Sequence, residues 1–264
     1  MRQLHTFGMP MATVYHDLDK IETEHYILRK VSYRYPDHAI QIMRGGMIPG
    51  DYVILWSKDR GCVVMSDTPM ERYTNRSLIA NAHGDICILG LGIGMVIFYL
   101  IEEQSFRSIY DDLEPTLNSI TIIEKDKELI DLIEPLIRNS VYFEESMISL
   151  NIINADAYEY SKLCNRRYDL VYADIWDDYI GYEEDAHIFD ELESLYRPFC
   201  SKFDGWGYDD SHGNNPYDES PIERDEYVEW LRDMIVHYKS YDMISSEISQ
   251  NISDYIHEMS ELTA

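Results

Sequence analysis

The stretch Asp85–Gly94, DICILGLGIG, decides the fold of this chain. Four apolar residues, Ile86–Leu89, lead directly into three glycines that alternate with apolar residues, and a second apolar run, Met95–Ile101, follows. A buried strand, a tight turn and the start of a helix produce such a pattern. The stretch therefore predicts the opening strand, turn and helix of an α/β unit that binds a nucleotide or a nucleoside.

The spacing of the glycines narrows the class of ligand. A dinucleotide-binding fingerprint is G-x-G-x-x-G, and its third glycine would fall where this chain has Met95. The pattern here is G-x-G-x-G, at Gly90, Gly92 and Gly94, the form associated with enzymes that use S-adenosylmethionine (SAM). We expect a helix over about 92–104, whose first N–H groups suit the amino-acid carboxylate of SAM.

From residue 85 onward, strand-like segments alternate with helix-like segments. This alternation predicts an α/β fold with a doubly wound, mostly parallel, Rossmann-like sheet. An irregular acidic insertion is expected at 105–118, and a fifth strand within 200–208. The expected strands are 85–89, 119–124, 150–155 and 168–174, and the expected helices are 92–104, 127–138, 157–164 and 183–196.

Three parts are expected along the chain. Residues 1–75 form a small β-rich unit, 76–200 the SAM-binding Rossmann-like domain, and 201–264 an acidic loop with a helical tail. Turn residues separate the short apolar runs of the first part, and no final β-hairpin is evident in the last part. The finer expectations are strands at 39–43, 52–56 and 62–65, and helices at 70–82, 222–239 and 243–261.

The charge of the chain is strongly acidic and bears on the substrate class. The 264 residues contain 22 Lys and Arg against 49 Asp and Glu, a formal net charge of −27. Binding to duplex nucleic acid needs clustered basic residues, so nucleic acid is not the expected substrate. Acidic clefts concentrate cations, so a small cationic molecule or a basic protein fits better. The alternative is that the acidity only confers solubility or salt tolerance.

Cysteine usage and hydropathy point to a soluble, cytoplasmic protein. The four cysteines lie far apart without C-x-x-C spacing, which predicts neither a zinc site nor a disulfide framework. The nine histidines are scattered, so we expect no metal site. No signal peptide is visible, and the longest apolar run, 86–101, is short for a membrane span. A homodimer is possible.

Each of the next three predicted strands ends at a carboxylate. Glu124, Asp156 and Asp174 follow them in order, and Asp177 lies just beyond Asp174. In an open parallel sheet, ligands bind beyond the carboxyl ends of the strands, so these carboxylates should face the glycine turn. Glu124 is placed to accept both ribose hydroxyls, Asp156 the adenine amino group, and Asp174 lies where the reactive end of the cofactor would meet an acceptor.

Each of these residues also has an ordinary structural interpretation. The glycine turn could serve tight strand–helix packing alone, and Glu124 could be a solvated strand end or a partner of a nearby lysine. Asp156 could be the N-cap of the helix that follows it. Asp174 and Asp177 could cap a helix or solvate a loop.

Taken together, these motifs resemble class I SAM-dependent methyltransferases, and within them the spermidine synthase-like branch, over roughly residues 50–200. The resemblance implies SAM as cofactor. It also implies that Asp174 would deprotonate or orient an acceptor amine and that Asp177 would bind its cationic end. The segments that carry it are Gly90–Gly94, Glu124–Asp126, Asp156–Ala157 and Tyr168–Asp177, with Gly90, Gly92, Gly94, Glu124, Asp156 and Ala157 as the implied cofactor-binding residues.

Three functions remain open on the sequence alone. The first is a SAM-dependent methyltransferase that acts on a cationic or amine acceptor. The second is a spermidine synthase-like aminopropyltransferase, which Ile93 and Asp178 oppose, because spermidine synthases have Asp and Pro there. The third is a non-catalytic, acidic binding protein that retains the SAM fold.

Overall fold

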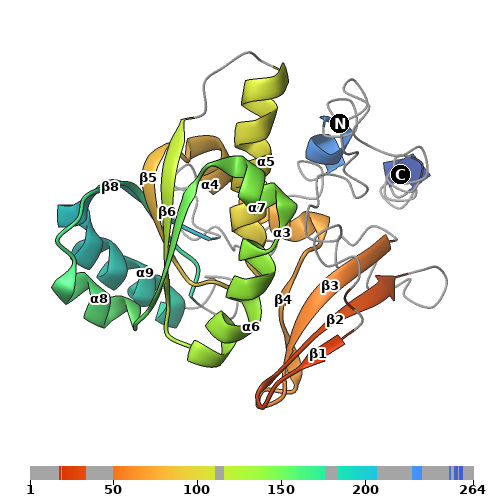
Figure 1. Ribbon diagram of the computed structural model, residues 1–264, viewed down its shortest axis with the longest axis horizontal. Helices are drawn as coiled ribbons and strands as arrows, with labels where there is room; N and C mark the ends of the chain where they lie inside the picture. The colour runs from red at the N-terminus through yellow and green to blue at the C-terminus, as the bar shows by residue number, and fades with distance from the viewer. Residues whose placement is uncertain are drawn as a thin grey trace. The chain divides into compact units, whose positions relative to one another are not determined.

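A computed structural model describes residues 18, 20–33, 50–110, 116–175, 183–206, 228–233, 250, 253–254 and 256–257 (Figure 1). The chain divides into two compact units, Met1–Tyr73 with Ile222–Ala264, and Thr74–Pro221. Each unit is considered by itself below. The expected strand at 39–43, and Asp177 and Asp178, lie outside the described residues.

The first unit contains an antiparallel sheet of four strands in the order β1-β2-β3-β4. Its strands are β1 (Lys20–Glu22), β2 (Tyr26–Tyr33), β3 (Gly50–Ser57) and β4 (Cys62–Ser66). The sequence predicts β3 and β4 but misses β1 and β2. In β2, Leu28 is fully buried while Arg29 beside it is exposed, and the charged residues of 20–33 leave only the short apolar run Tyr26–Leu28 to mark a strand.

A buried carboxyl group follows β4. Asp67 is 0% exposed, and its Oδ1 accepts a hydrogen bond of 2.7 Å from the main-chain N–H of Val53. Its Oδ2 has no hydrogen-bond partner among the described residues. Burial raises the pKa of this carboxyl to about 7, and the Val53 N–H offsets only part of that rise.

The second unit is built on a five-stranded, fully parallel sheet in the order β7-β6-β5-β8-β9. In chain order this is 3-2-1-4-5, which confirms the predicted doubly wound, Rossmann-like α/β fold. The strands are β5 (Gly84–Leu89), β6 (Leu117–Glu124), β7 (Ser149–Asn154), β8 (Tyr168–Ala173) and β9 (Cys200–Gly205).

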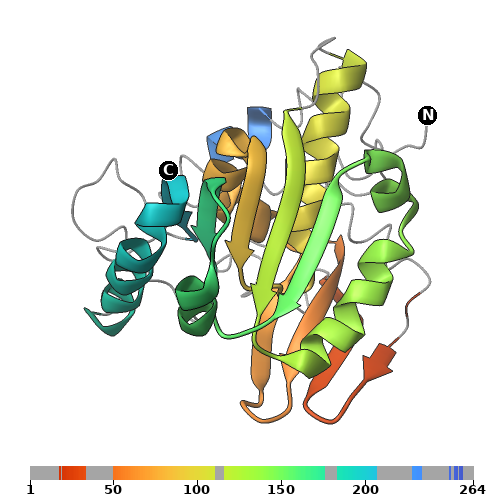
Figure 2. The same ribbon diagram turned by 60° about the vertical axis from the view of Figure 1, so that its left-hand side comes forward.

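Helices cover both faces of this sheet. In Figures 1 and 2, α8 and α9 lie on one face, and α5, α6 and α7 on the other. The chain also forms α3 (Pro69–Thr74), and a 3-10 turn (Arg197–Phe199) follows α9. The remaining bounds are α4 (Arg76–Asn81), α5 (Met95–Tyr110), α6 (Lys127–Arg138), α7 (Val141–Ser146), α8 (Ala157–Leu163) and α9 (Glu183–Tyr196).

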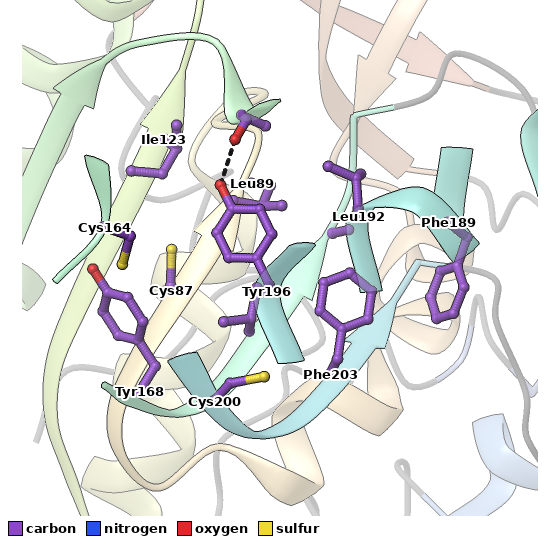
Figure 3. Packing of buried hydrophobic residues seen from close by; sticks show 13 residues of the cluster. Cys87, Leu89, Ile123, Cys164, Tyr168, Phe189, Leu192, Tyr196, Cys200 and Phe203 are labelled. Atoms are coloured by element: carbon purple, nitrogen blue, oxygen red, sulfur yellow. Dashed lines mark hydrogen bonds between the residues drawn. The ribbon is translucent and has the colours of Figure 1, made fainter. Parts of the chain in front are cut away.

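Successive side chains of each strand point to opposite faces of the sheet, so buried residues pack on both faces. One cluster of buried side chains joins the sheet to α8 and α9 (Figure 3). The interleaved strand residues, such as Ile86 and Ile88 of β5, are also buried, so β5 is buried on both of its faces, as central parallel strands are. The cluster of Figure 3 includes Cys87, Leu89, Ile123, Cys164, Tyr168, Phe189, Leu192, Tyr196, Cys200 and Phe203.

Several element boundaries differ from those predicted. α5 begins at Met95 rather than near Gly92, because Gly92 and Gly94 have φ values of 52° and 72°, outside the right-handed helical region. α5 also continues to Tyr110, so residues 105–110 are helical rather than part of an irregular insertion. The expected helix at 70–82 is two short helices, α3 and α4, that part at Asn75.

The remaining comparisons with the predicted elements concern α7, β9 and residues 228–233. α7 was not expected, whereas β9, at Cys200–Gly205, lies within the range 200–208 expected for a fifth strand. Residues 228–233 are helical, within the expected helix 222–239. None of the helices in the described part of the chain has the length and apolar character needed to cross a membrane.

The buried carboxyl of Asp67 should make stability depend on pH. Because its pKa is raised in the folded state, the native protein binds the proton more tightly than the unfolded chain. The free energy of unfolding should therefore fall as the pH rises from about 4 through 7. Asp67→Asn should reduce the difference in the free energy of unfolding between pH 5 and pH 8 by up to about 3 kcal/mol. Denaturant unfolding at both pH values measures this.

Asp233→Asn is the matched control, because it makes the same substitution at an exposed position of the same unit. It should leave the pH dependence of the wild type unchanged. An Asp67→Asn protein with the full wild-type pH dependence would contradict the assignment.

Candidate functional site

The candidate site lies where β5 and β8 end side by side. After β5 the chain continues through β6 and β7 on one side of the sheet, and β8 and β9 lie on the other side. This is the topological switch point, where open α/β sheets bind ligands. Main-chain pairing extends past the strands here: Asp174 N–H donates to Leu89 O over 2.8 Å, and Gly90 N–H donates to Ile123 O over 2.9 Å.

The glycine turn is shaped by close packing that excludes side chains. Gly90 has φ +105°, and a Cβ atom there would lie 2.1 Å from the main-chain oxygen of Asp174. A Cβ on Gly94 would lie 2.7 Å from Cδ1 of Ile137 in α6. Two of the three glycines are thus needed for close approach to neighbouring elements, and all three have positive φ.

Glu124 ties the glycine turn to the neighbouring strand. Its Oε2 accepts from the N–H of Leu91 over 3.0 Å, and its Oε1 accepts from the N–H of Asp126 over 2.8 Å. The side chain is buried, and desolvation raises its pKa although the two N–H groups oppose the shift. Each carboxylate oxygen has a second lone pair, so both can still accept a hydroxyl group.

Glu124 makes no ion pair with a lysine among the described residues, although the positive charge of Lys125 beside it favours the ionised carboxylate. Among the described residues, Lys127 pairs with Asp131 on its own helix, and the carboxylate of Glu124 bonds main-chain N–H groups instead. Glu124 therefore stabilises the conformation of the glycine turn through its bond to Leu91 N–H, independently of any ligand.

Asp156 caps α8 with one oxygen. Its Oδ1 accepts from Tyr158 N–H over 2.9 Å and from Glu159 N–H over 3.3 Å, the ordinary N-cap arrangement. No described residue donates to Oδ2, and the side chain is exposed, so this oxygen remains available to a ligand. Ala157, the first residue of α8, is 6% exposed.

The turns that carry Glu124 and Asp156 are joined through the main chain. Ala155 N–H donates to Glu124 O over 3.0 Å. The side-chain amide of Asn154 donates to Glu124 O over 3.1 Å and to Lys125 O over 2.9 Å. The expected ribose and adenine residues are therefore held at adjacent places on one edge of the sheet.

Asp174 provides a carboxyl group with unused hydrogen-bonding capacity. It is partly exposed, and no described residue makes a hydrogen bond or an ion pair with its side chain. The dense protein around it raises the pKa of this carboxyl to about 7 through desolvation. Asp177, the second expected catalytic residue, lies outside the described residues, so its role stays a prediction.

Sequence reasoning missed a set of contacts, all within the second unit, that anchor residues 74–77 to the end of the parallel sheet. Tyr172 donates to Oδ1 of Asn75 over 3.0 Å in the interior. The partners lie far apart in the chain and carry no shared motif, so nothing in the sequence pairs them. Two more contacts belong to this set, Ser77 Oγ to Asp204 Oδ2 at 2.8 Å and Trp206 Nε1 to Thr74 Oγ1 at 2.9 Å.

The described residues hold no group of three or more His, Cys, Asp or Glu side chains arranged to bind a metal ion.

Comparison with known proteins gives likeness in structure alone. No protein-family model matches the chain, and no curated protein matches it in sequence. Among solved structures it is similar to MNMC2 from Aquifex aeolicus, with 17% identity and a TM-score of 0.33, over 56% of this chain and 54% of that one.

Two further solved structures are similar to it. One is a candidate caffeoyl-CoA O-methyltransferase from Staphylococcus aureus, with 14% identity and a TM-score of 0.31, over 74% of this chain and 72% of that one. The other is a SAM-dependent methyltransferase from Clostridium acetobutylicum, with 16% identity and a TM-score of 0.27, over 51% and 46%. The chain spans about half the length of the first and third.

The close approach at Gly90 gives a direct test of the site's architecture. Gly90→Ala adds a Cβ that meets the Asp174 carbonyl and also strains the backbone, so we expect a loss of at least about 3 kcal/mol of stability. Ligand affinity should fall with it, because the turn must shift. Thermal unfolding and calorimetric titration with S-adenosylhomocysteine measure the two effects.

Gly61→Ala is the matched control. Gly61 also has positive φ, +65°, but a Cβ there meets nothing within 4 Å. It should cost only the backbone strain, about 1–2 kcal/mol, and leave affinity for S-adenosylhomocysteine intact. Equal losses in the two variants would mean that contact with Asp174 does not constrain the turn.

Proposed function

We propose that this protein is a SAM-dependent methyltransferase that acts on a cationic or amine acceptor. One observation carries the proposal. At the switch point, a glycine turn that excludes side chains bonds Glu124 and packs against the main chain of Asp174, and Asp156 lies on the turn joined to Glu124. Asp156 and Asp174 present carboxylate oxygens that no described residue uses. A nucleoside with a charged tail matches such a set of acceptors better than a dinucleotide, which needs the third glycine of its fingerprint.

The residues fit the parts of the cofactor one by one. Glu124 would accept the ribose hydroxyls with the lone pairs that the Leu91 and Asp126 N–H groups leave open. Oδ2 of Asp156 would accept from the adenine amino group. The glycine turn leads into the long helix α5, whose first N–H groups favour the amino-acid carboxylate. When bound, SAM supplies an activated methyl group.

Asp174 would bind the acceptor and take up its proton. An alkylamine is protonated at neutral pH, with a pKa near 10 for a lysine-like group, and must lose that proton before it can attack. An unpaired carboxylate beside the acceptor attracts the ammonium form and can take up its proton. A pKa of about 7 keeps the group largely ionised at slightly alkaline pH, and a nearby cation lowers the pKa further.

The overall charge supports a cationic acceptor. A net charge of −27 attracts cations to the protein and disfavours nucleic acid. We therefore propose a small cationic molecule or a basic protein as the acceptor. Assembly as a homodimer and a cytoplasmic location stay predictions.

Calorimetric titration of the full chain tests the cofactor. SAM and S-adenosylhomocysteine should bind at micromolar concentration, whereas decarboxylated SAM should bind at least about tenfold more weakly, because it lacks the carboxylate that the turn and α5 receive. Putrescine is the companion ligand. Preference for decarboxylated SAM together with putrescine binding would instead identify an aminopropyltransferase, and the absence of any adenosyl binding would reject both.

Asp174→Asn tests the acceptor chemistry. The substitution keeps the shape of the side chain but removes its charge and its ability to take a proton, so turnover of an amine acceptor should fall by roughly 10²-fold or more. Affinity for S-adenosylhomocysteine should stay within about threefold. In the wild type, kcat/KM for the acceptor reports the ligand-free carboxyl and should rise with pH through about 7 as that carboxyl ionises. The variant should lose that rise. Unchanged turnover would refute the role.

A further inference from the structure

A buried hydroxyl group from another helix reaches the turn that carries Asp156. Tyr196, the last residue of α9, is 0% exposed and donates from its hydroxyl to the main-chain oxygen of Ala157 over 2.7 Å. Figure 3 shows this bond crossing from the core to the start of α8. Ala157 directly follows Asp156, so the bond fixes the main chain one residue from the expected adenine acceptor.

The ring that carries this hydroxyl is itself held in place. Tyr196 stacks on Phe203 of β9 with ring centroids 6.4 Å apart and planes at 28°, and Phe203 in turn meets Phe189 of α9 edge to face at 5.2 Å. A phenol packed in this way has little rotational freedom, so its hydroxyl marks a fixed point. Burial raises the pKa of Tyr196, and the group stays a protonated donor.

The hydroxyl is not needed to complete the helix. The carbonyl of Ala157 lies in the first turn of α8, where an N–H four residues later serves it, and a phenylalanine would fill the apolar site without a polar group to satisfy. The extra bond therefore fixes the position of the Ala157 carbonyl and is not needed for the packing of the core. Oδ1 of Asp156 is already fixed by the Tyr158 and Glu159 N–H groups, so moving this turn moves Oδ2 with it.

We propose that Tyr196 is a positioning residue for adenine recognition: by holding the Ala157 carbonyl, it sets where Oδ2 of Asp156 meets the 6-amino group of the purine. The inference rests on the proposed function, because it assumes an adenosyl ligand at this edge. It adds that the site selects a 6-amino purine over a 6-oxo purine, and that a core residue without ligand contact controls that selection.

The test compares S-adenosylhomocysteine with S-inosylhomocysteine, in which an oxo group replaces the 6-amino group. Calorimetry on the wild-type chain should show about tenfold preference for the adenosyl compound, the low end of what one hydrogen bond to a solvent-exposed carboxylate contributes. Tyr196→Phe should reduce the preference to about threefold or less and leave affinity for the inosyl compound within about twofold. Asp156→Asn keeps the cap but presents an N–H₂ group, so it should abolish or reverse the preference.

Tyr168→Phe is the matched control. Tyr168 is 2% exposed in the same cluster, and its hydroxyl bonds that of Tyr160, further along α8, at 2.8 Å. This variant deletes the same atom from the same core and should keep the tenfold preference. Should Tyr196→Phe fail to fold, Phe203→Leu removes the ring stacked on Tyr196 but keeps the hydroxyl, and should lower the preference by about twofold to threefold.

Two results would overturn the inference. In one, Tyr196→Phe or its substitute retains the full preference. In the other, both ligands weaken equally, as a purely structural role predicts. A wild-type protein that binds neither compound would reject the proposed function itself, and the inference with it, which is distinguishable because the wild type then fails before any variant is compared.

Discussion

The contact between the ends of β5 and β8 is the constraint on which the rest of the site depends. Gly90 approaches the carbonyl of Asp174 so closely that no side chain fits between them. This contact brings the glycine turn and the free carboxyl of Asp174 to the same point of the sheet. The strand order, with β5 in the centre, makes that point the switch point, where open α/β sheets bind ligands.

The two edges of the sheet use their carboxylates differently. At the amino edge, Oδ2 of Asp169 accepts from Asp85 N–H over 2.8 Å, and Asp85 in turn bonds Ser119 and pairs with Arg166 at 3.1 Å. These groups lock strands together. At the carboxyl edge, Asp156 and Asp174 keep oxygens that no described residue uses. The contrast supports a structural role for the first edge and a binding role for the second.

Much of the fold was predictable because local sequence patterns specify it. The apolar run into glycines marks β5, and the strong apolar face of α6 marks its bounds, which agree with 127–138. The prediction failed where the signal is not local. In β2, the buried Leu28 is followed directly by charged residues. Helix α5 begins at Met95, later than predicted, because the conformation of the glycines, and not the apolar character of the segment, sets where the turn ends. For the site, the sequence predicts which carboxylates share an edge, but not that Glu124 bonds the turn or that Tyr196 reaches Ala157.

The central place of β5 also governs when the site can form during synthesis. Ile86 of β5 pairs with Leu170 of β8, so a nascent chain that has released β5, β6 and β7 from the ribosome still lacks the strand that carries Asp174. Contacts between such distant segments are slow to form, because the intervening chain must first be ordered. Until β8 arrives, the apolar side of β5 is exposed, and the growing chain is open to mispairing or capture by chaperones.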